Sequence, residues 1–109
     1  MDYLNSLFSL EGKVAVVVGG TGELCSHMAG GLAKAGATVV LVGRNAEKAQ
    51  QRIDQIGEVA GGAHFIAADI STRDSVEKLL ADVLAQFGKA DILVNGAGIN
   101  SPTPILDIT

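Results

Sequence analysis

The residues best suited to chemistry form a glycine-rich turn, Gly19-Gly20-Thr21-Gly22, which lies between an apolar run and an amphipathic stretch. Glycine permits a tight bend and lets the backbone approach a ligand closely. The first turn of a following helix adds unpaired N–H groups and the positive end of the helix dipole, which together bind anions such as phosphate. A purely structural turn is the alternative, but the setting between a strand and a helix favours a nucleotide site.

The elements that must position this turn alternate along the chain. Short runs rich in β-branched residues predict strands over 13–18, 38–42, 63–68 and 91–95, and amphipathic stretches predict three helices between them. Strands joined through helices pair in parallel with right-handed crossovers. We therefore expect an α/β fold of the Rossmann type. It would be a three-layer α/β/α arrangement with strand order 3-2-1-4, which is part of a doubly wound sheet.

Apolar spacing predicts a buried face for each of the three helices. The expected faces comprise Leu24, Cys25, Met28, Ala29, Leu32 and Ala33 in the first; Ala46, Ala49, Ile53 and Ile56 in the second; Val76, Leu79, Leu80, Val83, Leu84 and Phe87 in the third. Gly30 and Gly31 lie inside the first helix at a cost of roughly 1 kcal/mol each relative to Ala. We expect them to permit a close approach of this helix to the sheet.

Residue types also predict where the helices begin and end. Asn45 is placed to cap the second helix, and the segment from Ser71 to Asp74 has the spacing of a capping box for the third. Gly36 and Gly88 are expected to end the first and third helices. Strand four would then form an open apolar edge, with one face of the sheet short of covering helices.

Side chains at the ends of strands two and three indicate which nucleotide the fold would hold. An acidic residue at the end of strand two would bind the adenosine ribose and select NAD, but Gly43 stands there and Arg44 follows. A guanidinium pairs well with a 2′-phosphate, so the sequence favours NADP over NAD. Alternatively, Arg44 is a solvated residue at a helix start. Asp69 follows strand three, where an Asx-type turn is the structural alternative to a ligand contact.

Composition narrows the possible partners. The chain has 109 residues, a formal net charge of −4 and scattered basic residues, which argues against nucleic acid or an anionic membrane as a partner. The single cysteine, Cys25, fits a reducing cytoplasmic setting. His27 and His64 have no cysteine or carboxylate at metal-ligand spacing, so we expect no metal site.

Four segments in register give the chain a specific resemblance. Gly12-Lys13-Val14-Ala15, Gly19-Gly20-Thr21-Gly22, Ala68-Asp69-Ile70 and Asn95-Gly96-Ala97-Gly98 resemble the short-chain dehydrogenase/reductase family in order and spacing. The resemblance implies an NAD(P)-dependent oxidoreductase that transfers a hydride between nicotinamide and a carbonyl or alcohol. It also implies that Asp69 bonds the adenine amino group, that Ile70 packs on the ring, and that the backbone after strand four lines the ribose and nicotinamide side.

The predicted cofactor-binding residues come from the glycine turn and from the ends of the strands. They are Gly19, Thr21, Gly22, Glu23, Leu24, Gly43, Arg44, Asn45, Asp69, Ile70, Asn95, Ala97 and Gly98.

The glycine turn departs from the family pattern of Thr-Gly-x-x-x-Gly-x-Gly. Val18 stands where the threonine is usual, and Glu23 and Cys25 replace the second and third glycines. The Leu24-Cys25 pair resembles a subgroup of fructuronate/mannonate oxidoreductases, which implies a sugar acid as substrate. The Glu23 carboxylate would either turn to solvent or weaken the site by repelling a pyrophosphate. Cys25 is interpreted as a small packing residue rather than a nucleophile.

The catalytic group that the resemblance implies is a Ser with a Tyr-x-x-x-Lys pair, and it is not found. The only tyrosine is Tyr3, and Leu7 stands four residues after it. We therefore expect residues 1–109 to be a cofactor-binding, N-terminal part of a longer enzyme that forms homo-oligomers, and to be inactive alone. The alternative is a non-catalytic dinucleotide-binding or assembly module that is complete at this length.

Overall fold

A computed structural model describes residues 2–19, 22–59 and 61–96. In chain order the elements are α1 (Asp2–Phe8), β1 (Val14–Val18), α2 (Glu23–Lys34), β2 (Thr38–Gly43), α3 (Ala46–Ile56), β3 (Ala63–Ala67), α4 (Arg73–Phe87) and β4 (Ile92–Asn95). The predicted strands and the three helices between them are all present, with boundaries that differ by one or two residues. Helix α1 was not predicted.

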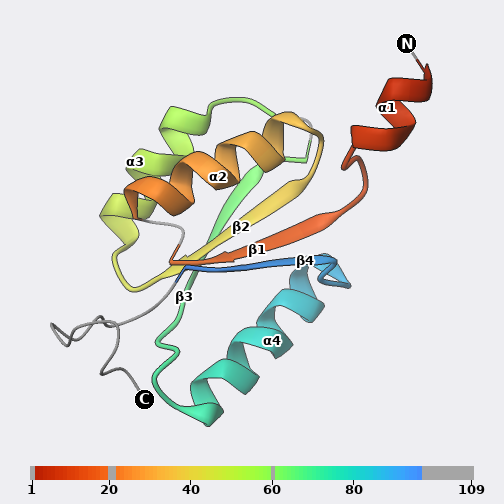
Figure 1. The fold of residues 1–109 in the computed structure, drawn as a ribbon. Helices are drawn as coiled ribbons and strands as arrows, with labels where there is room; N and C mark the ends of the chain where they lie inside the picture. The colour runs from red at the N-terminus through yellow and green to blue at the C-terminus, as the bar shows by residue number, and fades with distance from the viewer. Residues whose placement is uncertain (1, 20–21, 60, 97–109) are drawn as a thin grey trace, which may run out of the picture.

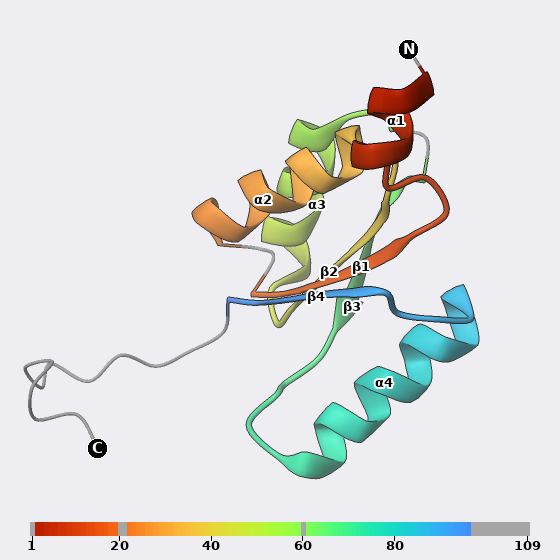
Figure 2. The same cartoon turned by 45° about the vertical axis from the view of Figure 1, so that its right-hand side comes forward.

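The strands form one parallel sheet with the order β3-β2-β1-β4, as the sequence predicts. Strand β1 pairs with β2 on one side and with β4 on the other. Helices α2 and α3 cover one face of the sheet and α4 covers the other (Figure 1), and the turned view shows the same three layers (Figure 2). This is the α/β/α arrangement that right-handed crossovers require of this strand order.

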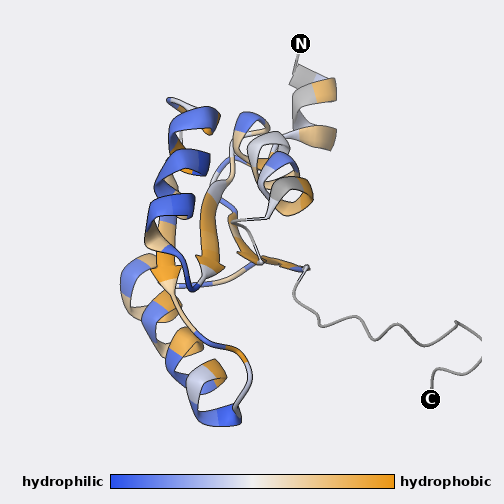
Figure 3. Cartoon of the chain, turned by 90° about the vertical axis from the view of Figure 1, so that its left-hand side faces the viewer, coloured by the Kyte–Doolittle hydropathy of each residue, from blue (hydrophilic) through white to orange (hydrophobic). Residues whose placement is uncertain are grey.

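Strands β1 and β2 supply more than half of the buried core residues, and their side chains alternate between the two faces of the sheet. Val16, Val40 and Val42 pack toward α4, with Leu79 and Val83 of that helix. Val17 and Leu41 pack toward α2 and α3. The strands are accordingly hydrophobic along most of their length, while hydrophilic residues gather on the helices (Figure 3). Strands buried on both faces read as continuous apolar runs, which is why their positions could be predicted.

Three of the four predicted helix starts and ends are confirmed, including the end of α2 before Gly36, which has a φ of +112°. The Asn45 side chain accepts a hydrogen bond of 3.0 Å from the Lys48 N–H at the start of α3. Gly88 ends α4 in the left-handed conformation. The predicted capping box is wrong by one residue: Thr72, not Ser71, caps α4, and its hydroxyl accepts from the Ser75 N–H at 3.2 Å.

The predicted buried face of α2 is partly wrong. Ala29 and Ala33 are buried, but Leu24 is 73% exposed and Met28 is 43% exposed. Ser26 is buried instead. Leu24 and Met28 lie at the margin of the helical stripe, and the sheet contacts only the narrow side on which the alanines lie.

The expectation that Gly30 and Gly31 permit close approach to the sheet is also wrong. A Cβ atom added at Gly31 would have no neighbour within 4 Å. One added at Gly30 would lie 3.7 Å from Ile56 of α3, which is an ordinary van der Waals distance. Neither glycine is therefore required by the packing of the described residues.

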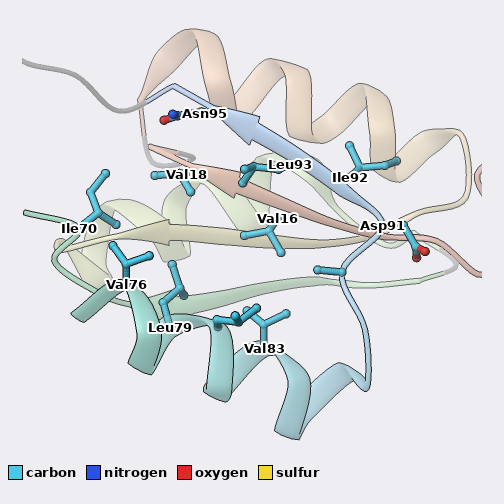
Figure 4. A pocket seen from close by; sticks show the side chains of 12 residues that line it. Val16, Val18, Ile70, Val76, Leu79, Val83, Asp91, Ile92, Leu93 and Asn95 are labelled. Carbon is cyan, nitrogen blue, oxygen red and sulfur yellow. The ribbon is translucent and has the colours of Figure 1, made fainter. Parts of the chain in front are cut away.

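Helix α4 buries less of its apolar stripe than predicted. Leu79 and Val83 are buried, whereas Val76, Leu80 and Leu84 are exposed. Val76, Leu79, Leu80 and Val83 border an apolar groove of about 430 Å³ between α4 and strands β1 and β4, hereafter the α4 groove (Figure 4). Leu93 of β4 lines it and is 68% exposed. The open apolar edge at strand four is thus confirmed for the described part of the chain.

None of the described helices is long and apolar enough to cross a membrane. Helix α1 lies apart from the sheet at the amino end of β1 (Figures 1 and 2). Its apolar side chains Tyr3, Leu7 and Phe8 are exposed.

Candidate functional site

The carboxyl ends of the four strands meet at one edge of the sheet. Val18, the last residue of β1, lies opposite Val42 of β2 and opposite Asn95, the last residue of β4. Gly43 at the end of β2 lies opposite Ala67 at the end of β3. The glycine turn and the residues that follow β2, β3 and β4 therefore leave the sheet side by side, and in open parallel sheets this edge is where ligands bind.

The turn after β1 is tight at its two described glycines. Gly19 has a φ of +81°, which side chains disfavour, and its N–H donates to the Val42 carbonyl at 2.9 Å. Gly22 turns back so that its N–H donates to the Gly19 carbonyl at 3.0 Å. A Cβ atom on Gly22 would lie 3.3 Å from that same oxygen, so the turn is tight enough to need glycine.

The amino end of α2 is open to a ligand. Gly22 precedes the helix with extended backbone angles, and no side chain makes a capping hydrogen bond there. The N–H groups of a helix start need partners, and an anion supplies them. Thr21 and the side chain of Glu23 lie outside the described part of the chain.

Cys25 is a packing residue, as the sequence interpretation proposed. Its side chain is partly buried against a cluster of Val17, Ala29 and Leu41. It also lies directly against Gly96, at the position where a Cβ atom of residue 96 would have to stand. The Gly96 N–H donates to the Val18 carbonyl at 2.9 Å, so this contact joins the start of α2 to the ends of β1 and β4. Sequence reasoning did not predict this contact.

The residues after β2 carry the charge that would select the cofactor. Arg44 is exposed at the carboxyl edge, directly after Gly43. Asn45 uses its side-chain oxygen to cap α3. No carboxylate stands at the end of β2 to bind a ribose 2′-hydroxyl.

The residues after β3 form an Asx-type turn. The Asp69 carboxylate accepts a hydrogen bond of 3.0 Å from the Ser71 N–H. This bond, a further one with the Ser71 side chain and the charge of Arg44 hold the pKa of Asp69 below its ordinary value. The Asx-type turn, which the sequence analysis gave as the structural alternative to a ligand contact, is therefore formed. The Asp69 carboxylate is nevertheless exposed at the carboxyl edge of the sheet. Ile70, beside it, borders the α4 groove (Figure 4).

The segment after β4 is described only in part. Asn95 is exposed at the end of β4 and is among the residues that line the α4 groove (Figure 4). Ala97 and Gly98, both predicted to contact the cofactor, lie outside the described residues. The groove is lined by apolar side chains of α4 and by none of the described glycines of the turn, so the two are separate features.

Other candidate chemistry is not supported among the described residues. No group of three or more histidine, cysteine or acidic side chains that could hold a metal occurs in residues 2–19, 22–59 and 61–96. His64 packs against the ring of Phe87, with ring centroids 5.1 Å apart. Tyr3 lies in α1, at the opposite end of the sheet from the glycine turn (Figure 1).

A parallel sheet of order 3-2-1-4 with a glycine turn between its first strand and an uncapped helix defines a dinucleotide-binding Rossmann fold. Within that class, the family model described as short chain dehydrogenase matches residues 13–109. The chain belongs to the short-chain dehydrogenase/reductase family.

Individual relatives agree with this assignment. The chain is 46% identical over 100 residues to the uncharacterized oxidoreductase UxuB of Bacillus subtilis, covering 92% of this chain and 36% of that protein. It is 43% identical over 94 residues to the 2-dehydro-3-deoxy-D-gluconate 5-dehydrogenase of Escherichia coli, covering 86% of this chain and 36% of that protein. The chain therefore spans little more than a third of the length of these relatives.

Solved structures show the same fold. A short-chain type dehydrogenase/reductase from Mycobacterium marinum superposes with a TM-score of 0.83 at 34% identity, covering 100% of this chain and 44% of the other. The L-sorbose reductase of Gluconobacter frateurii, solved with NADPH and L-sorbose, superposes with a TM-score of 0.79 at 33% identity. That match covers 94% of this chain and 39% of the reductase.

Proposed function

We propose that the protein containing this chain is an NAD(P)-dependent oxidoreductase that interconverts a carbonyl and an alcohol. The observation that carries the proposal is the glycine turn at the carboxyl edge. Gly19 and Gly22 bring backbone N–H groups and an uncapped helix start to one point, where a pyrophosphate would bind. When bound there, the nicotinamide cofactor supplies the hydride chemistry.

The cofactor is proposed to be NADP(H) rather than NAD(H). Arg44 would pair with the 2′-phosphate, and no carboxylate at the end of β2 would repel that phosphate. Asp69 would bond the adenine amino group and Ile70 would pack on the adenine ring. The NADPH bound by the L-sorbose reductase is consistent with this choice.

The substrate class is proposed to be a sugar acid. The Leu24-Cys25 pair suggested this subgroup, and the similarity to a 2-dehydro-3-deoxy-D-gluconate 5-dehydrogenase supports it. The exposed position of Leu24 in the first turn of α2 leaves its side chain available to a ligand.

The catalytic Ser, Tyr and Lys are proposed to lie in further residues of a longer protein, for which residues 1–109 provide the cofactor site. The greater length of the relatives supports this proposal. The uncovered α4 groove supports association between copies of that protein. A cytoplasmic location remains a prediction from the single cysteine.

The decisive experiment is titration of the intact gene product with NADPH and NADH, followed by the nicotinamide absorbance while sugar acids are offered as substrates. We expect binding of NADPH and turnover of at least one sugar acid. Binding of neither cofactor would contradict the dinucleotide site. Cofactor binding without turnover of any carbonyl or alcohol would favour the non-catalytic alternative.

A matched pair of variants tests the role of Arg44. Arg44→Gln should weaken NADPH binding by about tenfold, because a charge-assisted hydrogen bond is lost, and should change NADH binding by less than about twofold. Lys48→Gln removes the same charge from an exposed position on α3 and should change neither affinity. An Arg44→Gln variant that keeps its preference for NADPH would refute the assignment.

A further inference from the structure

Two opposite charges stand next to each other where the adenosine end of a cofactor would lie. The Ala68 N–H donates to the Gly43 carbonyl at 3.0 Å, which holds the ends of β2 and β3 together. Arg44 directly follows Gly43, and Asp69 directly follows Ala68. The two charged residues are thus fixed at neighbouring places on the carboxyl edge by the backbone.

The carboxylate of this pair is held in place and the guanidinium is not. The Ser71 N–H bonds the Asp69 carboxylate at 3.0 Å, and the lowered pKa of Asp69 keeps it ionised at neutral pH. Arg44 is exposed and forms no ion pair within the described part of the chain. The Arg44 side chain can therefore move between the Asp69 charge and a ligand.

We propose that Asp69 determines how strongly the protein prefers NADP over NAD, by competing with the 2′-phosphate for Arg44. This inference rests on the proposed cofactor site. NAD carries a hydroxyl at the 2′ position, so it leaves the attraction between Arg44 and Asp69 undisturbed. The 2′-phosphate of NADP must draw the Arg44 side chain away from Asp69. Asp69 therefore weakens a preference that Arg44 creates.

The test is the ratio of the dissociation constants for NADH and NADPH, measured by titration of the intact gene product. Asp69→Asn removes the charge but keeps an oxygen that can accept from the Ser71 N–H. Any change in the adenine contact affects both cofactors equally and cancels in the ratio. We expect the ratio to shift toward NADPH by about two- to fivefold, the range of an exposed ion pair.

The same substitution in an Arg44→Gln background shows whether the effect passes through Arg44. In that background we expect Asp69→Asn to change the ratio by less than about 1.5-fold, because the Arg44 guanidinium, for which Asp69 and the 2′-phosphate compete, is absent. An equal shift in both backgrounds would mean that Asp69 repels the phosphate directly, and would overturn the proposal. Asp54→Asn on α3 is the matched control: it removes one negative charge, keeps an acceptor for its bond to Gln50, and should leave the ratio unchanged.

The failure of this inference differs from the failure of the proposed function. If the unaltered protein binds neither cofactor, both are overturned. If it binds both cofactors and Asp69→Asn leaves the ratio unchanged, only the competition between Asp69 and the 2′-phosphate is refuted. A ratio that shifts toward NADH would refute the competition as well, because Asp69 would then assist Arg44.

Discussion

The contact between Cys25 and Gly96 predicts that a side chain at position 96 cannot be accommodated while the Cys25 sulfur is present. In Gly96→Ala, the new Cβ atom would overlap the Cys25 sulfur and would lie 3.1 Å from the Val18 carbonyl oxygen. The backbone at residue 96 has little freedom to withdraw, because its N–H is bonded to that same carbonyl. Gly96 does not have a positive φ, so the backbone itself accepts alanine and the penalty is one of packing. Overpacking of this kind costs about 1–3 kcal/mol.

A double-mutant cycle isolates this penalty. Cys25→Ala removes the sulfur and leaves its Cβ at 3.6 Å from the added atom, an ordinary contact. Alone it should cost about 1 kcal/mol of apolar burial. The double variant should recover about 1–2 kcal/mol relative to the sum of the single variants. The assay is the free energy of unfolding in urea, measured on the intact gene product.

The outcome that would refute the reasoning is additivity. If the two substitutions add to within about 0.5 kcal/mol, the sulfur and residue 96 are not in contact, and the start of α2 is not joined to β4 in this way. Cofactor affinity gives a second measurement. Gly96→Ala should weaken NADPH binding, because the displaced turn begins the segment expected to line the cofactor, and Cys25→Ala should restore part of that loss.

Three further predictions concern stability and use the same urea assay. Gly31→Ala should raise the free energy of unfolding by about 0.5–1 kcal/mol, because the added methyl group meets nothing; a loss of stability would show an unseen neighbour. Thr72→Ala should cost about 1 kcal/mol and Ser71→Ala much less, since Thr72 makes the cap; equal losses would contradict that assignment. The hydrogen bond from the Val14 N–H lowers the pKa of Asp91, so its contribution is present above the ordinary pKa and is lost as the pH falls through the lowered one. Asp91→Asn should therefore reduce the acid dependence of unfolding, and an unchanged pH profile would refute this.

The fold could be predicted because its central strands are buried on both faces. Residues 14–18 of β1 and 39–42 of β2 are all apolar and buried, so both read as unbroken apolar runs. Helical connections between such runs leave few topologies, and the order 3-2-1-4 follows from the place of the glycine turn. Position along the chain then fixes which residues meet at the carboxyl edge.

Helix faces were less predictable, for a geometric reason. A stripe of apolar residues on a helix can be wider than the surface that covers it. Leu24 and Met28 in α2, and Leu80 and Leu84 in α4, continue the apolar spacing beyond the sheet that the described chain provides. Their spacing indicates that a helix forms but does not show which margin of the stripe is covered. The offset of the α4 cap from Ser71 to Thr72 has a similar origin, since both residue types can cap a helix.

The site could be predicted where it depends on single strand ends and not where it depends on a contact between distant segments. Arg44 and Asp69 each follow a strand, so their place at the edge is implied by the topology. Nothing in the sequence near Cys25 indicates Gly96, because the two meet only after β4 has paired with β1.

That contact changes how the unusual glycine turn should be read. Judged by the family pattern, cysteine at position 25 replaces a glycine that allows the helix start to approach the sheet closely. In this structure the residue without a side chain is Gly96 at the end of β4 instead of residue 25 in α2. The Cys25 sulfur occupies the space that a Cβ atom of residue 96 would fill. The close approach of α2 to the end of β4 requires one small residue at the contact, and either side can supply it. A count of glycines within the turn therefore underestimates how well this chain can form the phosphate-binding geometry, since the compensating residue lies at the end of β4.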